Sequence, residues 1–308
     1  MKSRFRGLVA APFTPFKSDK SINLDVIPAY ARLLRDNGVT AAFVCGTTGE
    51  GLSLTMQERK DVAEAWMKVA DDKLSVIVHV GNNCISEAQE LTRHAAKIGA
   101  AAVGAFAPCF FKPRDNDELV NWCAAIAGAA PEIPFYYYNI PSMTGVNFKV
   151  APFLAKAAGR IPSLAGVKYT YEDLEDFEEC VKFEGGRYDL LFGRDELLME
   201  GCGRGALGAV GSTYNYAAPL YVKIMEHLKA GKTQEARTLQ DKAIKMISIC
   251  ASVGVTHQSA TKSMMAWHGV DCGPMRLPVS TITPTQSAEL RRKLMEIDYF
   301  GTACRPGA

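Results

Sequence analysis

The residue with the clearest capacity for chemistry is Lys168, which closes the apolar segment Ile161–Val167. An amine at the end of a buried strand is partly removed from water, and this loss of hydration disfavours the charged ammonium. We therefore expect a lowered pKa and a nucleophilic amine that can form a Schiff base with a ketone. The alternative is a lysine whose long stem reaches from the strand end to solvent. Its position alone leaves both interpretations open.

A glycine–threonine turn, Gly46–Gly49, offers successive backbone N–H groups and the hydroxyls of Thr47 and Thr48. Such a nest, placed before a helix, can hold a carboxylate without a cationic side chain. An ordinary turn would have the same composition, because glycine supplies positive φ and threonine caps helices. The turn is therefore a candidate carboxylate site but does not by itself establish one.

Tyr138 ends a run of three tyrosines, Tyr136–Tyr138. Side chains alternate along a strand, so only one or two of these rings can point to the same side. A phenol held near a Schiff base can act as general acid and base. Aromatic packing is the alternative, and it is the favoured explanation for Tyr137.

Two patterns that often mark cofactor or metal sites receive little weight here. Gly203, Gly205 and Gly208 match the dinucleotide pattern GxGxxG, but they precede a strand instead of linking a strand to a helix. The histidines are His79, His94, His227, His257 and His268. They are dispersed and lack HxH or HExxH spacing, so a catalytic divalent metal has little support. We predict neither a cofactor nor a metal.

Eight short apolar runs alternate with helical patterns over the first two-thirds of the chain. The expected strands are Gly7–Ala11, Ala41–Cys45, Leu74–Val80, Ala102–Ala107, Ile133–Tyr138, Leu164–Lys168, Tyr188–Phe192 and Ala206–Val210. Most are apolar throughout, which is typical of parallel strands that are covered on both faces. The clearest helical patterns are Leu24–Asn37, Met56–Ala70, Ser86–Ile98 and Asn116–Ala129. Thr55 and Glu58 predict a capping box at the start of the second of these helices.

This alternation predicts an α/β fold, a (β/α)8 TIM barrel with a helical C-terminal extension. A doubly wound sheet would need fewer strands and a topological switch. We assign residues 1–216 to the barrel core and 217–308 to the last barrel helix and the extension, within a single domain. Residues 217–303 are expected to be helical, with a break at Gly273, Pro274 and Pro278.

The barrel fold brings the candidate residues together, because the reacting groups of such barrels lie at the carboxyl ends of the strands. Five expected strands end in polar or glycine-rich segments. These segments are Gly46–Glu50, Tyr138–Pro141, Lys168–Thr170, Gly193–Glu196 and Gly211–Thr213. They are predicted to form one site.

Composition narrows the function classes further. Of 308 residues, 48% are hydrophobic and 22% charged, with a net charge of +2, as in a globular enzyme. No basic run suggests nucleic acid or a membrane surface, and no window approaches eighteen apolar residues. The nine cysteines are isolated, and the opening residues lack a signal-peptide pattern, so we expect reduced thiols and a cytoplasmic protein.

Taken together, four ordered motifs resemble the N-acetylneuraminate lyase and dihydrodipicolinate synthase superfamily. They are Gly46–Gly51, Tyr138–Gly145, the strand that ends at Lys168, and Gly211–Asn215. Each is weak alone, but the four in this order along nearly the whole chain are specific. The resemblance implies that Lys168 forms the Schiff base and Tyr138 moves protons. It also implies that Thr47 and Thr48 hold the carboxylate of pyruvate.

Two features favour the sialic acid lyase branch of this superfamily. The synthases typically carry an arginine five residues after the catalytic tyrosine, where Met143 stands here and cannot pair with a carboxylate. The segment Gly193–Glu196 resembles the Gly-x-Asp-Glu loop of the lyases. The implied substrate contacts are Thr47, Thr48, Thr170, Gly193, Asp195, Glu196, Gly211 and Ser212. The resemblance thus implies reversible cleavage of N-acetylneuraminate to N-acetylmannosamine and pyruvate by a homotetramer.

Other functions stay open at this point. One is a pyruvate-dependent enzyme of the same fold acting on a shorter sugar acid such as 2-keto-3-deoxygluconate. Others are a barrel that binds a sugar acid without turnover, and a metal-dependent aldolase. One departure also matters: many relatives place a tyrosine from a neighbouring subunit in the site, whereas Pro108–Pro113 contains Phe110 and Phe111 and no tyrosine. A proton relay through a partner subunit is therefore in doubt, and two alternatives stay open: Thr47 alone links Tyr138 to solvent, or water fills the gap.

Overall fold

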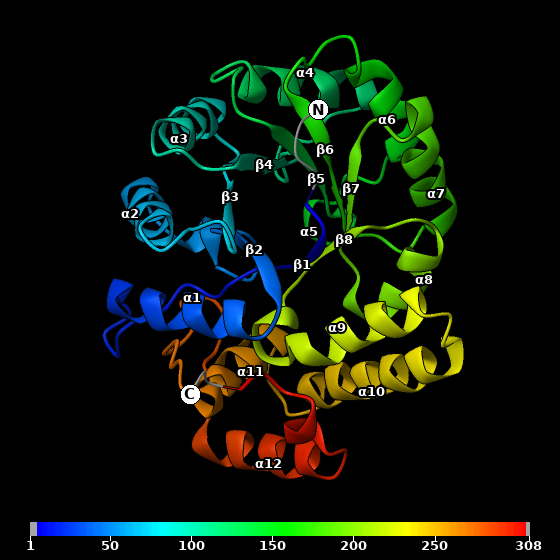
Figure 1. Cartoon of the computed structure of the whole chain (residues 1–308). Helices are drawn as coiled ribbons and strands as arrows, with labels where there is room; N and C mark the ends of the chain where they lie inside the picture. The colour runs from blue at the N-terminus through cyan, green and yellow to red at the C-terminus, as the bar shows by residue number, and fades with distance from the viewer. Residues whose placement is uncertain (1–4, 306–308) are drawn as a thin grey trace.

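The computed structural model describes residues 5–305 and shows a closed barrel of eight parallel strands surrounded by helices (Figure 1). The strands follow one another in chain order, and β1 pairs with β8 to close the barrel. They are β1 (Gly7–Ala10), β2 (Val39–Val44), β3 (Ser75–His79), β4 (Ala102–Phe106), β5 (Phe135–Asn139), β6 (Leu164–Tyr169), β7 (Asp189–Phe192) and β8 (Gly208–Gly211). The predicted (β/α)8 fold is confirmed.

Two hydrophobic layers explain why the strands are apolar along their whole length. Leu8 and Ala10 of β1 belong to the core between barrel and helices, whereas Val9 belongs to the core inside the barrel. Because side chains alternate, both faces of each strand are buried. The same alternation places Tyr136 and Tyr138 inside the barrel and Tyr137 outside it, with its ring 4.6 Å from that of Phe153. The prediction that Tyr137 serves packing is confirmed.

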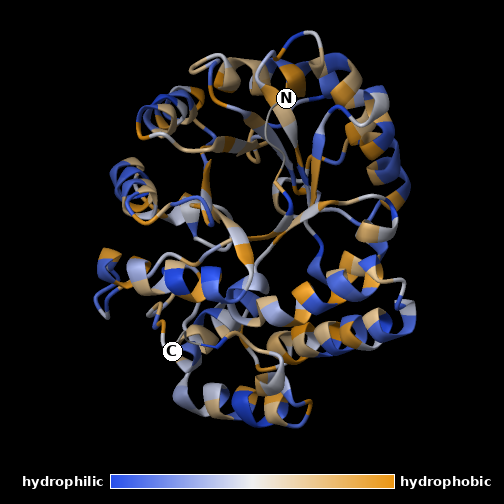
Figure 2. Cartoon of the chain, viewed as in Figure 1, coloured by the Kyte–Doolittle hydropathy of each residue, from blue (hydrophilic) through white to orange (hydrophobic). Residues whose placement is uncertain are grey.

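The α-helices follow the strands around the outside of the barrel and continue beyond it. They are α1 (Ile27–Asp36), α2 (Met56–Met67), α3 (Ile85–Lys97), α4 (Asn116–Ala127), α5 (Pro141–Thr144), α6 (Val150–Ala157), α7 (Leu174–Lys182), α8 (Leu198–Gly203), α9 (Tyr214–Lys229), α10 (Thr233–Ala251), α11 (His257–Met264) and α12 (Pro284–Met295). In Figure 2 the outer helices carry both hydrophilic and hydrophobic residues, while the strands are coloured mainly from white to orange. This pattern fits helices with one face on the barrel and one in water.

Most element boundaries agree with the sequence within about three residues. The expected helix Leu24–Asn37 differs, because Leu24–Val26 form a 3₁₀ turn and the α-helix begins at Ile27, with Pro28 in its first turn. Proline there lacks an N–H that would have no helical partner anyway. The capping box of Thr55 and Glu58 at the start of α2 is confirmed.

The C-terminal extension consists of α10, α11 and α12 at one side of the barrel (Figure 1). In it α10 packs along α9, and α11 and α12 contact α10. No α-helix lies between His268 and Pro284, so the expected break at Gly273 is confirmed. The last barrel helix, α9, begins at Tyr214 and so starts within the residues assigned to the core. Within residues 5–305, no helix has the length and hydropathy needed to span a bilayer.

Candidate active site

A cavity opens where the carboxyl ends of the strands meet, and the loops after β2, β5, β6, β7 and β8 line it. Its walls include every residue that the sequence analysis assigned to the site: Thr47, Thr48, Tyr138, Lys168, Thr170, Gly193, Asp195, Glu196, Gly211 and Ser212. The barrel therefore brings together five segments that are far apart in the chain. What each residue does there remains a prediction.

Lys168 lies inside the barrel mouth and is 4% exposed. The parallel register of β6 with its neighbours places it beside Tyr138 of β5 and Leu191 of β7. Its Nζ atom is 4.0 Å from the centre of the Tyr138 ring and 4.2 Å from that of Phe43. Burial lowers the pKa of Lys168 to about 7, and the Asp195 carboxylate opposes this shift. A substantial neutral fraction is therefore present near pH 7, and a stem that reaches bulk solvent is excluded.

Tyr138 is buried at the end of β5, and its hydroxyl group is 3.3 Å from the hydroxyl of Thr47. Phe43 meets its ring edge-on at a centroid distance of 5.5 Å. Burial raises the pKa of Tyr138 to about 12, while the hydrogen bond with Thr47 acts in the opposite direction. The phenol is therefore protonated at neutral pH, and its proton can be exchanged with a reacting group beside Lys168.

The loop after β2, Gly46–Gly51, holds Thr47 and Thr48 at the cavity wall. The N–H of Gly51 donates to the carbonyl oxygen of Gly46 at 3.0 Å, which closes the loop on itself. A Cβ atom on Gly51 would lie 1.9 Å from the carbonyl oxygen of Cys45, so this position admits no side chain. Cys45 and Glu50 both adopt left-handed backbone conformations, with φ of 57° and 54°. Such conformations are uncommon outside glycine and persist where surrounding contacts hold them.

The two carboxylates after β7 have different environments. Asp195 is buried, and its Oδ2 accepts hydrogen bonds from the backbone N–H of Thr213 at 3.1 Å and from its hydroxyl at 2.7 Å. Burial raises the pKa of Asp195 to about 6. Glu196 is half-buried and forms an ion pair with Arg194 at 2.9 Å. A Cβ atom on Gly211 would lie 1.9 Å from Asp195 Oδ1, so only glycine leaves room for this carboxylate.

The cavity wall includes residues of the C-terminal extension that the sequence does not predict. Ile247 of α10 and His257 of α11 reach the cavity from the C-terminal extension. Arg194, within the predicted segment Gly193–Glu196, also lines the cavity. Burial lowers the pKa of His257. No local pattern marks Ile247 or His257, because the extension folds back on the barrel only through tertiary packing.

Neither cofactor-like pattern of the sequence forms a site at the cavity. The GxGxxG segment runs from the end of α8 into β8 and so leads into a strand, as expected. Among residues 5–305, no three His, Cys, Asp or Glu residues gather closely enough to hold a metal ion. Met143 is exposed on α5 and lines a second, adjoining cavity that shares Thr47 and Ile140 with the first.

Known proteins share this fold and much of this sequence. N-acetylneuraminate lyase of Mus musculus is 40% identical over 304 residues, which are 98% of this chain and 95% of the mouse protein. The structure of Proteus mirabilis N-acetylneuraminate lyase is 41% identical, with a TM-score of 0.93 over 96% of this chain and 100% of that one. A Ruminococcus gnavus sialic acid aldolase, solved as a catalytic lysine mutant, is 28% identical with a TM-score of 0.90 over 96% of each chain.

Residues 4–297 match the Dihydrodipicolinate synthetase family, which is almost the whole chain. The match agrees with the resemblance inferred from the four motifs and with the barrel that places them around one cavity. By sequence and by fold, the chain belongs to the dihydrodipicolinate synthetase family.

Proposed function

We propose that this protein is a Schiff-base aldolase that cleaves N-acetylneuraminate, reversibly, to N-acetylmannosamine and pyruvate. The observation that carries the proposal is the buried amine of Lys168, with its pKa lowered to about 7, beside Tyr138 in the barrel mouth. The relatives at about 40% identity over nearly full length bear the name of this activity.

In the proposed reaction the neutral amine of Lys168 attacks the keto carbon of the substrate. The Tyr138 phenol gives its proton to the departing hydroxyl of the resulting carbinolamine, so water leaves and an iminium–phenolate pair remains. The positive iminium stabilises a phenolate that burial alone would disfavour. Because the iminium accepts electrons, the C3–C4 bond can break to an enamine in place of a free carbanion.

Tyr138 then completes the proton transfers. Its phenolate takes the proton of the C4 hydroxyl as the C3–C4 bond opens, which releases the sugar as an aldehyde. The phenol returns this proton to C3 of the enamine and restores the iminium. Water adds to the iminium and gives one proton to the Tyr138 phenolate. The carbinolamine then releases pyruvate, and Lys168 returns to its neutral amine. The hydroxyl of Thr47, at 3.3 Å, fixes the direction of the phenol and connects it to the cavity.

The remaining cavity residues are proposed to hold the two ends of the substrate. Backbone N–H groups and hydroxyls of Thr47 and Thr48 hold the carboxylate. On the opposite wall, Asp195 and Glu196 accept hydrogen bonds from the sugar hydroxyls. The further contacts of the sugar are Thr170, Gly193, Gly211 and Ser212. The exposed thioether of Met143 offers no partner for a second carboxylated substrate, which supports the lyase over the synthase.

The test is to trap the covalent intermediate. Borohydride reduction in the presence of pyruvate should add one pyruvate-derived mass to the peptide that contains Lys168, and Lys168→Met should remain unlabelled. In parallel, pyruvate release is measured from N-acetylneuraminate and from 2-keto-3-deoxygluconate. Label on another lysine would exclude the mechanism, and release only from the shorter acid would replace the proposed substrate.

We also propose that the protein assembles as a homotetramer. Phe110 and Phe111, in the loop after β4, are 78% and 86% exposed and meet edge-to-face at a centroid distance of 5.0 Å. Two adjacent aromatic rings in water favour contact with another protein surface. Because neither ring carries a hydroxyl, the proposed proton path runs through Thr47 without a group from a partner subunit.

A further inference from the structure

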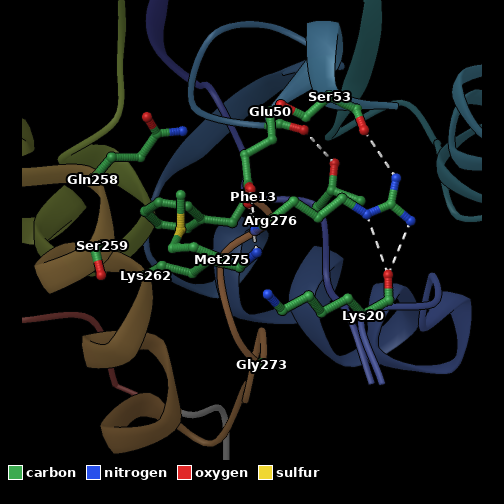
Figure 3. Close-up of polar contacts among 12 residues, drawn as sticks. Phe13, Lys20, Glu50, Ser53, Gln258, Ser259, Lys262, Gly273, Met275 and Arg276 are labelled. Atoms are coloured by element: carbon green, nitrogen blue, oxygen red, sulfur yellow. Dashed lines mark hydrogen bonds and ion pairs between the residues drawn. The ribbon is translucent and has the colours of Figure 1, made fainter. Parts of the chain in front are cut away.

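The C-terminal extension contacts the carboxylate-binding loop through one side chain of α11. Gln258 donates both of its amide protons: its Nε2 atom is 2.8 Å from the carbonyl oxygen of Thr47 and 3.0 Å from that of Thr48. The two carbonyls are consecutive along the chain, so one amide group fixes two neighbouring peptide planes. Figure 3 shows Gln258 and Lys262 projecting from α11 toward the loop that carries Glu50.

The geometry of a trans peptide converts these contacts into a constraint on the cavity. The C=O of one residue and the N–H of the next lie in one plane and point in opposite directions. A Thr47 carbonyl held by Gln258 therefore directs the N–H of Thr48 away from α11. In the same way, the held carbonyl of Thr48 directs the N–H of Gly49. These N–H groups belong to the nest that is proposed to bind the substrate carboxylate.

Other contacts fasten the same loop to the extension independently of Gln258. Lys262, one helical turn after Gln258, forms an ion pair with Glu50 at 2.7 Å, and their side chains are 1% and 5% exposed. The second oxygen of Glu50 accepts the backbone N–H of Arg276 at 2.9 Å. The loop thus stays attached to the extension when the amide of Gln258 is removed. The Thr47 carbonyl then keeps the hydrogen bond from the N–H of Glu50, at 3.1 Å, and both carbonyls lose the hydrogen bond from Gln258.

We propose that Gln258 is a positioning residue for keto-acid recognition: by holding the carbonyls of Thr47 and Thr48, it aims the backbone N–H groups that bind the carboxylate. This inference rests on the proposed function and assigns to the C-terminal extension a part in substrate selection. Gln258 acts through the backbone of the loop and does not touch the reacting atoms. Its loss should weaken binding of the carboxylate group specifically, while Lys168 keeps its reactivity toward ketones.

The experiment compares two ketones that differ in the carboxylate. Borohydride trapping on Lys168 is measured against the concentration of pyruvate and of acetone, in which a methyl group replaces the carboxylate. In Gln258→Leu we expect the half-saturating pyruvate concentration to rise roughly tenfold, because two hydrogen bonds that orient the nest are lost. The trapping rate with acetone should change less than about twofold, since acetone does not use the nest. Ser263→Ala, on the same helix and bonded to the carbonyl of Ala260, is the matched control.

A second variant, Gln258→Glu, keeps the size of the side chain but, when ionised, presents only acceptor oxygens to the two carbonyls. Gln258→Glu should raise the half-saturating pyruvate concentration at least as much as Gln258→Leu does. It provides the test by itself if Gln258→Leu fails to fold. Equal losses of Lys168 trapping with pyruvate and with acetone in a folded variant would overturn the inference, because they would indicate general damage to the site. The inference would also be overturned if the ratio of trapping with pyruvate to trapping with acetone were the same in the variant as in wild type. A wild-type protein without any pyruvate adduct would instead refute the proposed function.

Discussion

At the scale of single residues, one physical cause prepares both central groups of the site. Burial lowers the pKa of Lys168 and raises that of Tyr138, so it shifts both groups toward their uncharged forms. Formation of the carbinolamine requires a neutral amine as the nucleophile. Its dehydration requires an acid, which the protonated phenol supplies. A buried ammonium–phenolate pair would carry a large desolvation cost before any substrate had bound. The neutral pair avoids this cost until the iminium forms.

The first prediction concerns pH. The folded-state pKa of Lys168 is about 7, so the neutral fraction grows as pH rises through this value. The value of kcat/KM should therefore increase about tenfold per pH unit below pH 7 and level off above it. It is measured from pH 5 to 9 with N-acetylneuraminate. Asp195 has a raised pKa of about 6 and adds a second transition on the acidic side, which Asp195→Asn would remove. A profile that rises only near pH 10 would contradict a desolvated Lys168.

The second prediction separates the roles of Lys168 and Tyr138. Tyr138→Phe removes a positioned proton donor and acceptor, which commonly contributes about a hundredfold to ten-thousandfold in rate. Lys168→Ala removes the electron sink itself and should abolish measurable kcat. In Tyr138→Phe, borohydride trapping of pyruvate should survive at a reduced rate. Equal kcat losses, with trapping lost in both variants, would show that the division of roles is wrong.

At the scale of elements, the sequence predicts the strands and the loops that follow them. It does not predict that the C-terminal extension packs against these loops. Apolar runs such as β6 can be predicted as strands because both of their faces are buried. Since the reacting groups of such barrels lie at the carboxyl ends of the strands, Lys168 and Tyr138 are then expected at the same end. Gln258 and His257 lie on α11, more than two hundred residues after the loop that Gln258 holds. Local pattern carries no information about such a contact, which only tertiary packing creates.

The third prediction tests this packing through the buried ion pair between Lys262 of α11 and Glu50. Lys262→Met leaves the carboxylate of Glu50 buried with the Arg276 N–H but without its cation. Breaking one partner of a buried pair typically costs about 3–5 kcal/mol of unfolding free energy. The double variant Lys262→Met, Glu50→Gln buries no unpaired charge and should recover most of this loss. Both are compared with wild type by urea unfolding at pH 7. A single variant as stable as wild type would contradict the prediction.

At the scale of the whole molecule, two sides of the barrel differ in what they expose to solvent. The extension covers one side of the barrel with α10, α11 and α12 (Figure 1). The loop after β4 exposes Phe110 and Phe111 to solvent. The proposed mechanism uses only Lys168, Tyr138 and Thr47, which belong to one chain. Assembly would therefore serve to cover this aromatic pair and need not supply a reacting group.

The fourth prediction tests this separation of assembly from chemistry. Phe111→Glu places a charge on the exposed pair and should convert the proposed tetramer of 33.5 kDa chains into smaller species in sedimentation velocity. Because the proposed mechanism uses no group from another chain, kcat per chain should fall less than about threefold, the range expected when no reacting group is lost. Met295→Glu, at a 63% exposed position on α12, is the matched control and should leave the assembly unchanged.

The two readouts distinguish the outcomes of this last experiment. Smaller species that keep their turnover support an interface at Phe111 and a proton path confined to Tyr138 and Thr47. Smaller species that lose nearly all turnover would show that a neighbouring chain completes the site, and the proposed path through Thr47 alone would be wrong. A wild-type chain that sediments as a monomer would refute the tetramer. The aromatic pair would then require another partner, because two exposed rings in the loop after β4 are costly to leave in water.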